Sequence, residues 1–99
     1  MLIKEMQEKA KRLLDQSHVE NSIELRCLDI ISAAGKLADE ARKISISKHG
    51  TSVNEGRLES SIGSLVLSVV HLANATGVDL SDAITNVLDG RSNNDRRIR

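Results

Sequence analysis

Apolar residues recur every three or four positions along most of the chain, with polar residues between them. The first such segment carries Leu2, Met6, Ala10, Leu13 and Leu14. Residues three or four apart lie on one face of a helix, so this spacing predicts a helix over about residues 2 to 15.

A second segment predicts a longer helix over about residues 22 to 43. Its apolar positions share one face and are Cys27, Ile30, Ile31, Ala34, Ala38 and Ala41. The polar stripe beside them consists of Asp29, Ser32, Lys36, Asp39 and Lys43. We expect the apolar face, with Cys27 on it, to lie in the core. Asn21, with Glu24 three residues later, has the chemistry of a capping box and predicts the start of this helix.

The next stretch, residues 45 to 54, predicts a loop. Gly50 and the Ser, Thr and Asn residues around it favour turns over periodic structure. Ser52 and Glu55 offer a second capping box for the following helix.

The stretch from Glu59 to Leu72 reads ESSIGSLVLSVVHL and is rich in β-branched residues, which favour a strand. The apolar pattern, however, continues from Leu58 to Ala75, which is longer than a usual strand and therefore predicts a helix. Gly77 follows where a C-capping glycine belongs. This helix is apolar on several sides, as is typical of a central or interface helix.

A short fourth helix is predicted from its cap, Asp79, through Leu88, and Gly90 ends it. Residues 1–90 should therefore form a single all-α domain. Residues 91–99 should form a disordered basic tail, whose arginines are Arg91, Arg96, Arg97 and Arg99. A solubility tail is favoured over one that contacts nucleic-acid phosphates.

Composition narrows the function classes. A chain of 99 residues has a thin core unless copies associate, so we expect a homo-oligomer, either a dimer or a tetramer. Phe, Trp and Tyr are absent, which removes the rings on which bases stack. The 14 basic residues balance the 14 acidic ones, so charge gives no attraction to nucleic acid or membrane. The lone Cys27 and the lack of a signal-like or membrane-length apolar run predict a soluble cytoplasmic protein.

Three motifs carry a family resemblance. Gly35 to Glu40 reads GKLADE and resembles the pattern G-E-L-A-E-x, while Leu72 to Leu80 reads LANATGVDL and resembles L-A-x-x-x-G-I-D-L. The SDAI that follows resembles E-E-A-[VL]. With the order of helices, these motifs resemble the MazG-like all-α nucleoside triphosphate pyrophosphohydrolases, which include phosphoribosyl-ATP pyrophosphatase and the dimeric dUTPases. The resemblance covers roughly residues 22 to 90 and implies a four-helix MazG-like fold that assembles as a dimer or higher oligomer.

The resemblance also implies where the family's chemistry belongs. E-E-x-x-E on the second helix and E-x-x-D on the third hold Mg²⁺ against the triphosphate and position the attacking water. On this chain the five acidic positions fall on Ser32, Ala33, Lys36, Ser61 and Ser64. None of them is acidic, and the Lys36 cation would repel a metal ion. We therefore expect no catalytic residue, no metal and no other cofactor.

Two readings of these positions stay open. In one, they form a residual phosphate pocket in which Lys36 opposes a phosphate and Ser32, Ser61 and Ser64 donate hydrogen bonds. In the other, which is favoured, small residues allow close helix packing and the serine hydroxyls bond to their own backbone. His71 continues the serine line and reads as a partly buried helix residue rather than a base.

These observations leave three alternative functions. The favoured one is a catalytically inactive, oligomeric binding or regulatory protein with a nucleotide or protein partner. The second is an active Mg²⁺-dependent pyrophosphohydrolase whose acids come from Glu40, Glu55 or Glu59 across a subunit interface. The third is a helical module that binds protein or nucleic acid.

Overall fold

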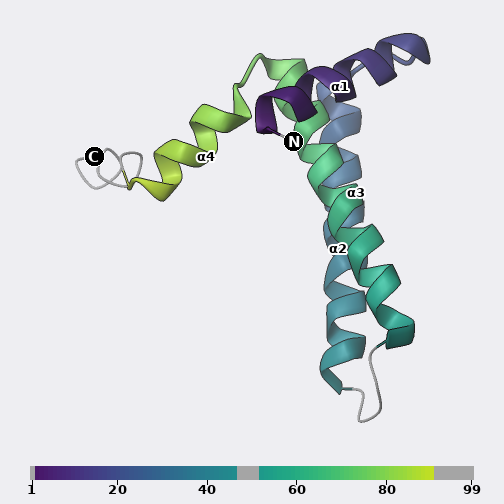
Figure 1. The fold of residues 1–99 in the computed structure, drawn as a ribbon. Helices are drawn as coiled ribbons and strands as arrows, with labels where there is room; N and C mark the ends of the chain where they lie inside the picture. The colour runs from purple at the N-terminus through teal and green to yellow at the C-terminus, as the bar shows by residue number, and fades with distance from the viewer. Residues whose placement is uncertain (1, 47–51, 91–99) are drawn as a thin grey trace.

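The computed structural model describes residues 2–46 and 52–90, with side chains throughout except at residues 52–55. Within these ranges the chain forms four α-helices and no strand: α1 (Ile3–Gln16), α2 (Ile23–Ile46), α3 (Ser52–Thr76) and α4 (Leu80–Leu88). Helices α2 and α3 run side by side as a long antiparallel hairpin (Figure 1). Helix α1 crosses one end of this hairpin, and α4 projects away from the same end. The prediction of an all-α helical bundle is confirmed.

The end of α3 and both ends of α4 follow the predicted capping chemistry. Gly77 has a φ of 76° and ends α3 in the left-handed conformation that glycine adopts without steric cost. The Asp79 carboxylate accepts a hydrogen bond from the Asp82 N–H at 3.0 Å and caps α4. Gly90, with a φ of 76°, follows α4.

The cap of α2 differs from the prediction. The Ser22 hydroxyl, not the Asn21 side chain, accepts the Leu25 N–H at 3.3 Å. Ser22 directly precedes the first helical residue, which is the position from which a short side chain reaches the third helical N–H. The Asn21 amide instead donates to the His71 carbonyl at 2.9 Å and ties the start of α2 to α3.

The predicted loop over residues 45–54 is too long, because α2 continues to Ile46 and α3 begins at Ser52. Ile44 and Leu58 are both half-buried near the tip of the hairpin. Packing between α2 and α3 therefore extends both helices into the polar stretch that was predicted as a loop. The predicted capping box at Ser52 and Glu55 and the predicted basic tail at 91–99 involve side chains outside the described residues.

Helices α2 and α3 meet along a seam with alternating spacings of three and four residues. The seam positions are all half-buried, and they are Arg26, Ile30, Ala33, Leu37, Glu40 and Ile44 on α2 and Leu58, Ser61, Leu65, Ser68, Leu72 and Ala75 on α3. This heptad spacing is that of an antiparallel coiled coil, in which side chains of each helix fit between those of the other.

The seam corrects the predicted core face of α2. Of that face, only Ile30 packs against α3, whereas Cys27, Ile31, Ala34, Ala38 and Ala41 are exposed. The seam lies one position earlier in each repeat, which rotates the contact by about 100° around the helix. Leu37 and the aliphatic parts of Arg26 and Glu40 fill it, so two residues that look polar in the sequence take core positions.

The fully buried core is small. Among the described residues it consists of Ala10, Val70 and Ala73, where α1 crosses α3. Helix α3 from Gly56 to Thr76 is also long and apolar enough to cross a membrane by length and composition, the one such helix in the described ranges. A chain with so little covered apolar surface is poorly stabilised by its own packing.

Candidate functional site

A polar hollow of about 230 Å³ lies between α2 and α3. Nearer the other end of the hairpin, α1 packs on this same side, against Leu67 and His71. It is lined by Ala33, Lys36, Ser60, Ser61 and Ser64. Four of these are positions where the family resemblance expects an acid, so residues separated by up to 31 positions in the chain come together. The fifth such position, Ser32, is exposed on α2 and does not line the hollow.

The coiled-coil seam positions these side chains. Ala33 and Ser61 are half-buried seam residues and form the floor, while Lys36, Ser60 and Ser64 are exposed and form the rim. Small side chains on both helices leave the space that large seam residues would fill. Ser60 was not singled out from the sequence, although its spacing of four from Ser64 places both on one helical face.

Lys36 supplies the charge of the hollow. It makes no ion pair or hydrogen bond to any described residue. The acids one turn away are engaged elsewhere: Asp39 with Arg42 at 3.0 Å and Lys43 at 3.2 Å, and Glu40 with Lys43 at 3.7 Å. Hydrogen bonds from Arg42 and Lys43 hold the pKa of Asp39 below its usual range. The hollow therefore presents an unneutralised cation.

The serine hydroxyls divide into two groups. Ser68 donates to the Ser64 carbonyl at 3.0 Å, which is the backbone bonding expected of a serine inside a helix. The hydroxyls of Ser60, Ser61 and Ser64 make no hydrogen bond within the described part of the chain. These three hydroxyls can therefore donate to a bound anion beside Lys36.

Carboxylates do not gather at the hollow. No group of three or more His, Cys, Asp or Glu side chains that could hold a metal ion occurs in the described ranges. Glu59 points about 160° away from Ser61 around α3, because the two residues are two positions apart in a helix. The lining of Lys36 and hydroxyls suits an anion rather than Mg²⁺, which proteins usually bind through one or two carboxylates together with water.

His71 lies toward the other end of the hairpin. It lines a hollow of about 150 Å³ with residues of α1, including Ala10 and Leu14. Burial, and then the nearby charge of Arg26, lower the pKa of His71, and Asp29 opposes this shift. The nitrogen Nδ1 is buried without a hydrogen-bond partner in the described residues. Ser17 lines the same hollow, but its hydroxyl donates to the Leu14 carbonyl at 2.8 Å.

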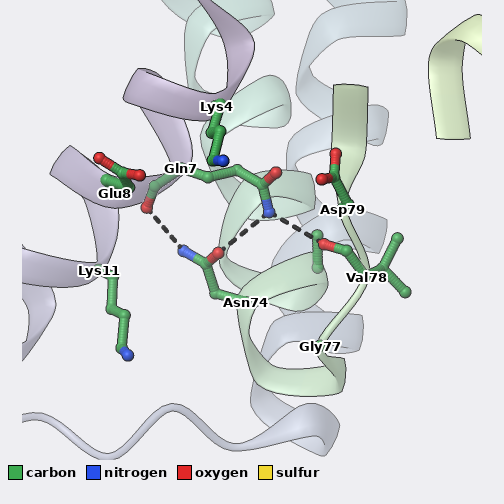
Figure 2. A pocket seen from close by; sticks show the side chains of 9 residues that line it. Lys4, Gln7, Glu8, Lys11, Asn74, Gly77, Val78 and Asp79 are labelled. Carbon is green, nitrogen blue, oxygen red and sulfur yellow. Dashed lines mark hydrogen bonds between the residues drawn. The ribbon is translucent and has the colours of Figure 1, made fainter. Parts of the chain in front are cut away.

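A hydrogen-bonded clamp joins α1 to the α3–α4 turn, around a hollow of about 300 Å³ (Figure 2). Gln7 Nε2 donates to Asn74 Oδ1 at 3.1 Å and to the Val78 carbonyl at 3.0 Å. Gln7 Oε1 accepts the Leu80 N–H at 2.8 Å, and Asn74 Nδ2 donates to the Gln7 carbonyl at 3.1 Å.

The clamp was not predicted, since Gln7 looks like an ordinary polar helix residue in the sequence. Its amide groups bond one another and the turn, so they fix the direction of α4 and leave little capacity for a ligand. The polar hollow with Lys36 is therefore the stronger candidate site.

In comparisons with protein-family models, curated proteins and solved structures, nothing matches this chain.

Proposed function

We propose that this chain is a catalytically inactive MazG-like protein that works as a cytoplasmic homo-oligomer and binds a phosphate-bearing ligand, such as a nucleotide, in the polar hollow. The observation that carries the proposal is the lining of the hollow. Ala33, Lys36, Ser61 and Ser64 take the places of four acids that the family resemblance expects to hold Mg²⁺. A site with one cation and free hydroxyls favours binding an anion over activating water with a metal.

The ligand's phosphate is the part that the hollow recognises. Lys36 is a flexible point charge that can oppose a phosphate oxygen, and the three serine hydroxyls can donate to the others. The chain has no Phe, Trp or Tyr, so base stacking cannot add affinity. Binding should therefore depend on phosphate number more than on the base.

Calorimetric titration tests this function. We expect ATP, GTP, dUTP and inorganic triphosphate to bind with similar affinity, each tighter than its monophosphate. The substitution Lys36→Ala should weaken binding roughly tenfold, because an exposed charge-assisted hydrogen bond contributes about 1 to 1.5 kcal/mol. Lys9→Ala, which removes an exposed lysine of α1, is the matched control and should leave the affinity unchanged.

The same protein should be incubated with Mg²⁺ and nucleoside triphosphates at high concentration. Release of monophosphate and pyrophosphate would contradict the proposal and favour an active enzyme whose acids come from another subunit. Equal affinity of the Lys36→Ala and unaltered proteins for these ligands would show that the ligand binds outside the hollow.

A further inference from the structure

A second, smaller hollow lies on the same side of the hairpin as the polar hollow, where α1 crosses α3. We call it the α1 hollow. It has a volume of about 150 Å³ and is lined by Ala10, Leu13, Leu14, Ser17, Leu67 and His71. Leucine and alanine side chains form most of this lining, and none of the lining residues is Asp, Glu, Lys or Arg. The α1 hollow therefore suits an apolar group of a ligand.

Helix α3 joins the two hollows along one face. Ser64 lines the polar hollow, whereas Leu67 and His71 line the α1 hollow. At 100° per residue these three positions fall within about 60° around α3, and the helical rise separates Ser64 from Leu67 by only about 4.5 Å. Both Ser64 and Leu67 are exposed, so the surface between the hollows is open to a ligand. One molecule can therefore reach both hollows.

The charges along this face distinguish its two ends. Lys36, which no described residue neutralises, places a cation at the polar hollow. At the α1 hollow, the charges that act on His71 are those of Arg26 and Asp29, which pair with each other at 3.3 Å. A phosphate is therefore favoured beside Lys36, and a neutral group is favoured at the α1 hollow.

The volumes of the hollows also link them. Small-molecule sites in proteins typically measure about 300 to 1,000 Å³. Neither hollow reaches this range alone, at about 230 Å³ and about 150 Å³, but the two together do. An apolar cavity of about 150 Å³ holds a molecule the size of benzene, so the α1 hollow has room for about six carbon atoms.

The lining of the α1 hollow favours an aliphatic group over a nucleobase. The chain contains no Phe, Trp or Tyr, so a flat base gains no stacking. The polar edge of a base would also find few partners, because the Ser17 hydroxyl already donates to the Leu14 carbonyl at 2.8 Å. Methylene groups need neither partner nor ring, since their burial against leucine is favourable in proportion to the apolar area removed from water.

We propose that the two hollows form one elongated site for a phosphate ester that carries an aliphatic group of about six carbon atoms. Its phosphate lies beside Lys36 and the serine hydroxyls, and its aliphatic group lies in the α1 hollow against Leu67. The inference rests on the phosphate-binding hollow of the proposed function and names the organic part of the ligand.

Calorimetric titration with methyl, propyl, hexyl and decyl phosphate, each below its micelle concentration, tests the elongated site. The affinity of the unaltered chain should rise about two- to fourfold for each added methylene up to hexyl phosphate, because each methylene leaves water for the α1 hollow. The rise should then level off, because the α1 hollow is full.

Leu67→Asn and Val66→Asn are matched substitutions on α3. Leu67 is 47% exposed and lines the α1 hollow, whereas Val66 is 44% exposed, projects about 100° away around the helix and lines neither hollow. Leu67→Asn should reduce the preference for hexyl over methyl phosphate about tenfold and leave the affinity for methyl phosphate unchanged. Val66→Asn should keep the preference. Circular dichroism should show that both variants remain helical.

Equal affinity of the unaltered chain for methyl and hexyl phosphate would overturn the inference and leave the phosphate site of the proposed function in place. Equal loss of the preference in the two asparagine variants would also overturn it. Lys36→Ala should weaken every ester by the same factor of roughly ten, so loss of phosphate binding and loss of the chain-length preference are separable failures.

A lipid surface is the other source of an aliphatic phosphate ester. Sedimentation of the unaltered chain with phosphatidic acid vesicles, without binding of soluble hexyl phosphate, would overturn the inference in favour of a membrane surface. Failure of methyl phosphate, hexyl phosphate and inorganic triphosphate alike to bind would overturn both this inference and the proposed function.

Discussion

At the residue scale, several polar atoms are buried without a hydrogen-bond partner in the described part of the chain. Three of them, Asn21 Oδ1, Arg26 Nε and His71 Nδ1, belong to residues that join the start of α2 to α3. Arg26 also pairs with Asp29 at 3.3 Å beside this region. Burial, and then the nearby Arg26 cation, make protonation of His71 unfavourable and lower its pKa.

Stability should therefore depend on pH through His71. Its pKa in the folded chain lies below the ordinary 6.5, so the unfolded chain takes up the proton first as pH falls. Stability falls as pH drops through 6.5 and levels off below the folded pKa. Urea unfolding should give a lower midpoint at about pH 5.5 than at about pH 7.5. His71→Gln should reduce this difference, and His18→Gln, at an exposed position, should not.

The carboxylates contribute in a separate pH range. The pKa of Glu24 is lowered by a hydrogen bond from its own backbone N–H and then by one from Ser22, and that of Asp39 by Arg42 and Lys43. Their stabilisation is present above their ordinary values of 4.5 and 3.8 and is lost at lower pH. A midpoint shift confined to acid below 4.5 would assign the pH dependence to these groups and contradict the role of His71.

At the element scale, α4 depends on α1 for its direction. Its apolar side, formed by Ala83, Ile84, Val87 and Leu88, lines a wholly apolar hollow of about 300 Å³ and is not packed against the hairpin. The cap at Asp79 and the Gly77 turn start the helix, but they do not set its direction relative to α1. The Gln7 clamp sets this direction, because the Gln7 side chain bonds both the Val78 carbonyl and the Leu80 N–H of the turn.

Gln7→Ala should release α4 from α1. The substitution removes three side-chain hydrogen bonds, which at about 0.5 to 1.5 kcal/mol each corresponds to a loss of roughly 1.5 to 4.5 kcal/mol. Amide hydrogens of residues 80–88 should exchange faster, as measured by mass spectrometry, while those of the α2–α3 hairpin should change little. Gln16→Ala at the exposed end of α1 is the control. Unchanged exchange in α4 would mean that other contacts hold it.

At the scale of the whole molecule, the chain is extended. Its Cα radius of gyration is 16.2 Å, whereas a compact domain of 99 residues has about 12.6 Å. The three buried apolar residues of the described ranges sit at one end of the hairpin, so most of the described apolar surface has no cover within one chain. Folding and association should therefore be linked.

The thermal unfolding midpoint should consequently rise with protein concentration, because mass action favours an assembly whose parts unfold on dissociation. A tenfold increase in concentration should raise the midpoint by several degrees for the unaltered chain. A midpoint that is independent of concentration in the unaltered chain would argue for a self-sufficient monomer.

The helices and their ends were largely predictable, because their signals are local. Apolar spacing placed all four helices, and Gly77, Asp79 and Gly90 marked three boundaries. The cap at Ser22 and the extension of α2 to Ile46 were missed, because each depends on which neighbouring side chain or helix is within reach. The candidate site was predictable as a set of positions, and the structure added Ser60 and left out Ser32.

The sequence by itself determined the helical class, the element order and the lack of acids at Ser32, Ala33, Lys36, Ser61 and Ser64. Only the tertiary structure decided which side of α2 meets α3, because two adjacent stripes of that helix have seam spacing and periodicity alone does not choose between them. That choice buries the stems of Arg26 and Glu40, opens the polar hollow beside Lys36 and leaves the apolar stripe with Cys27 and Ile31 exposed.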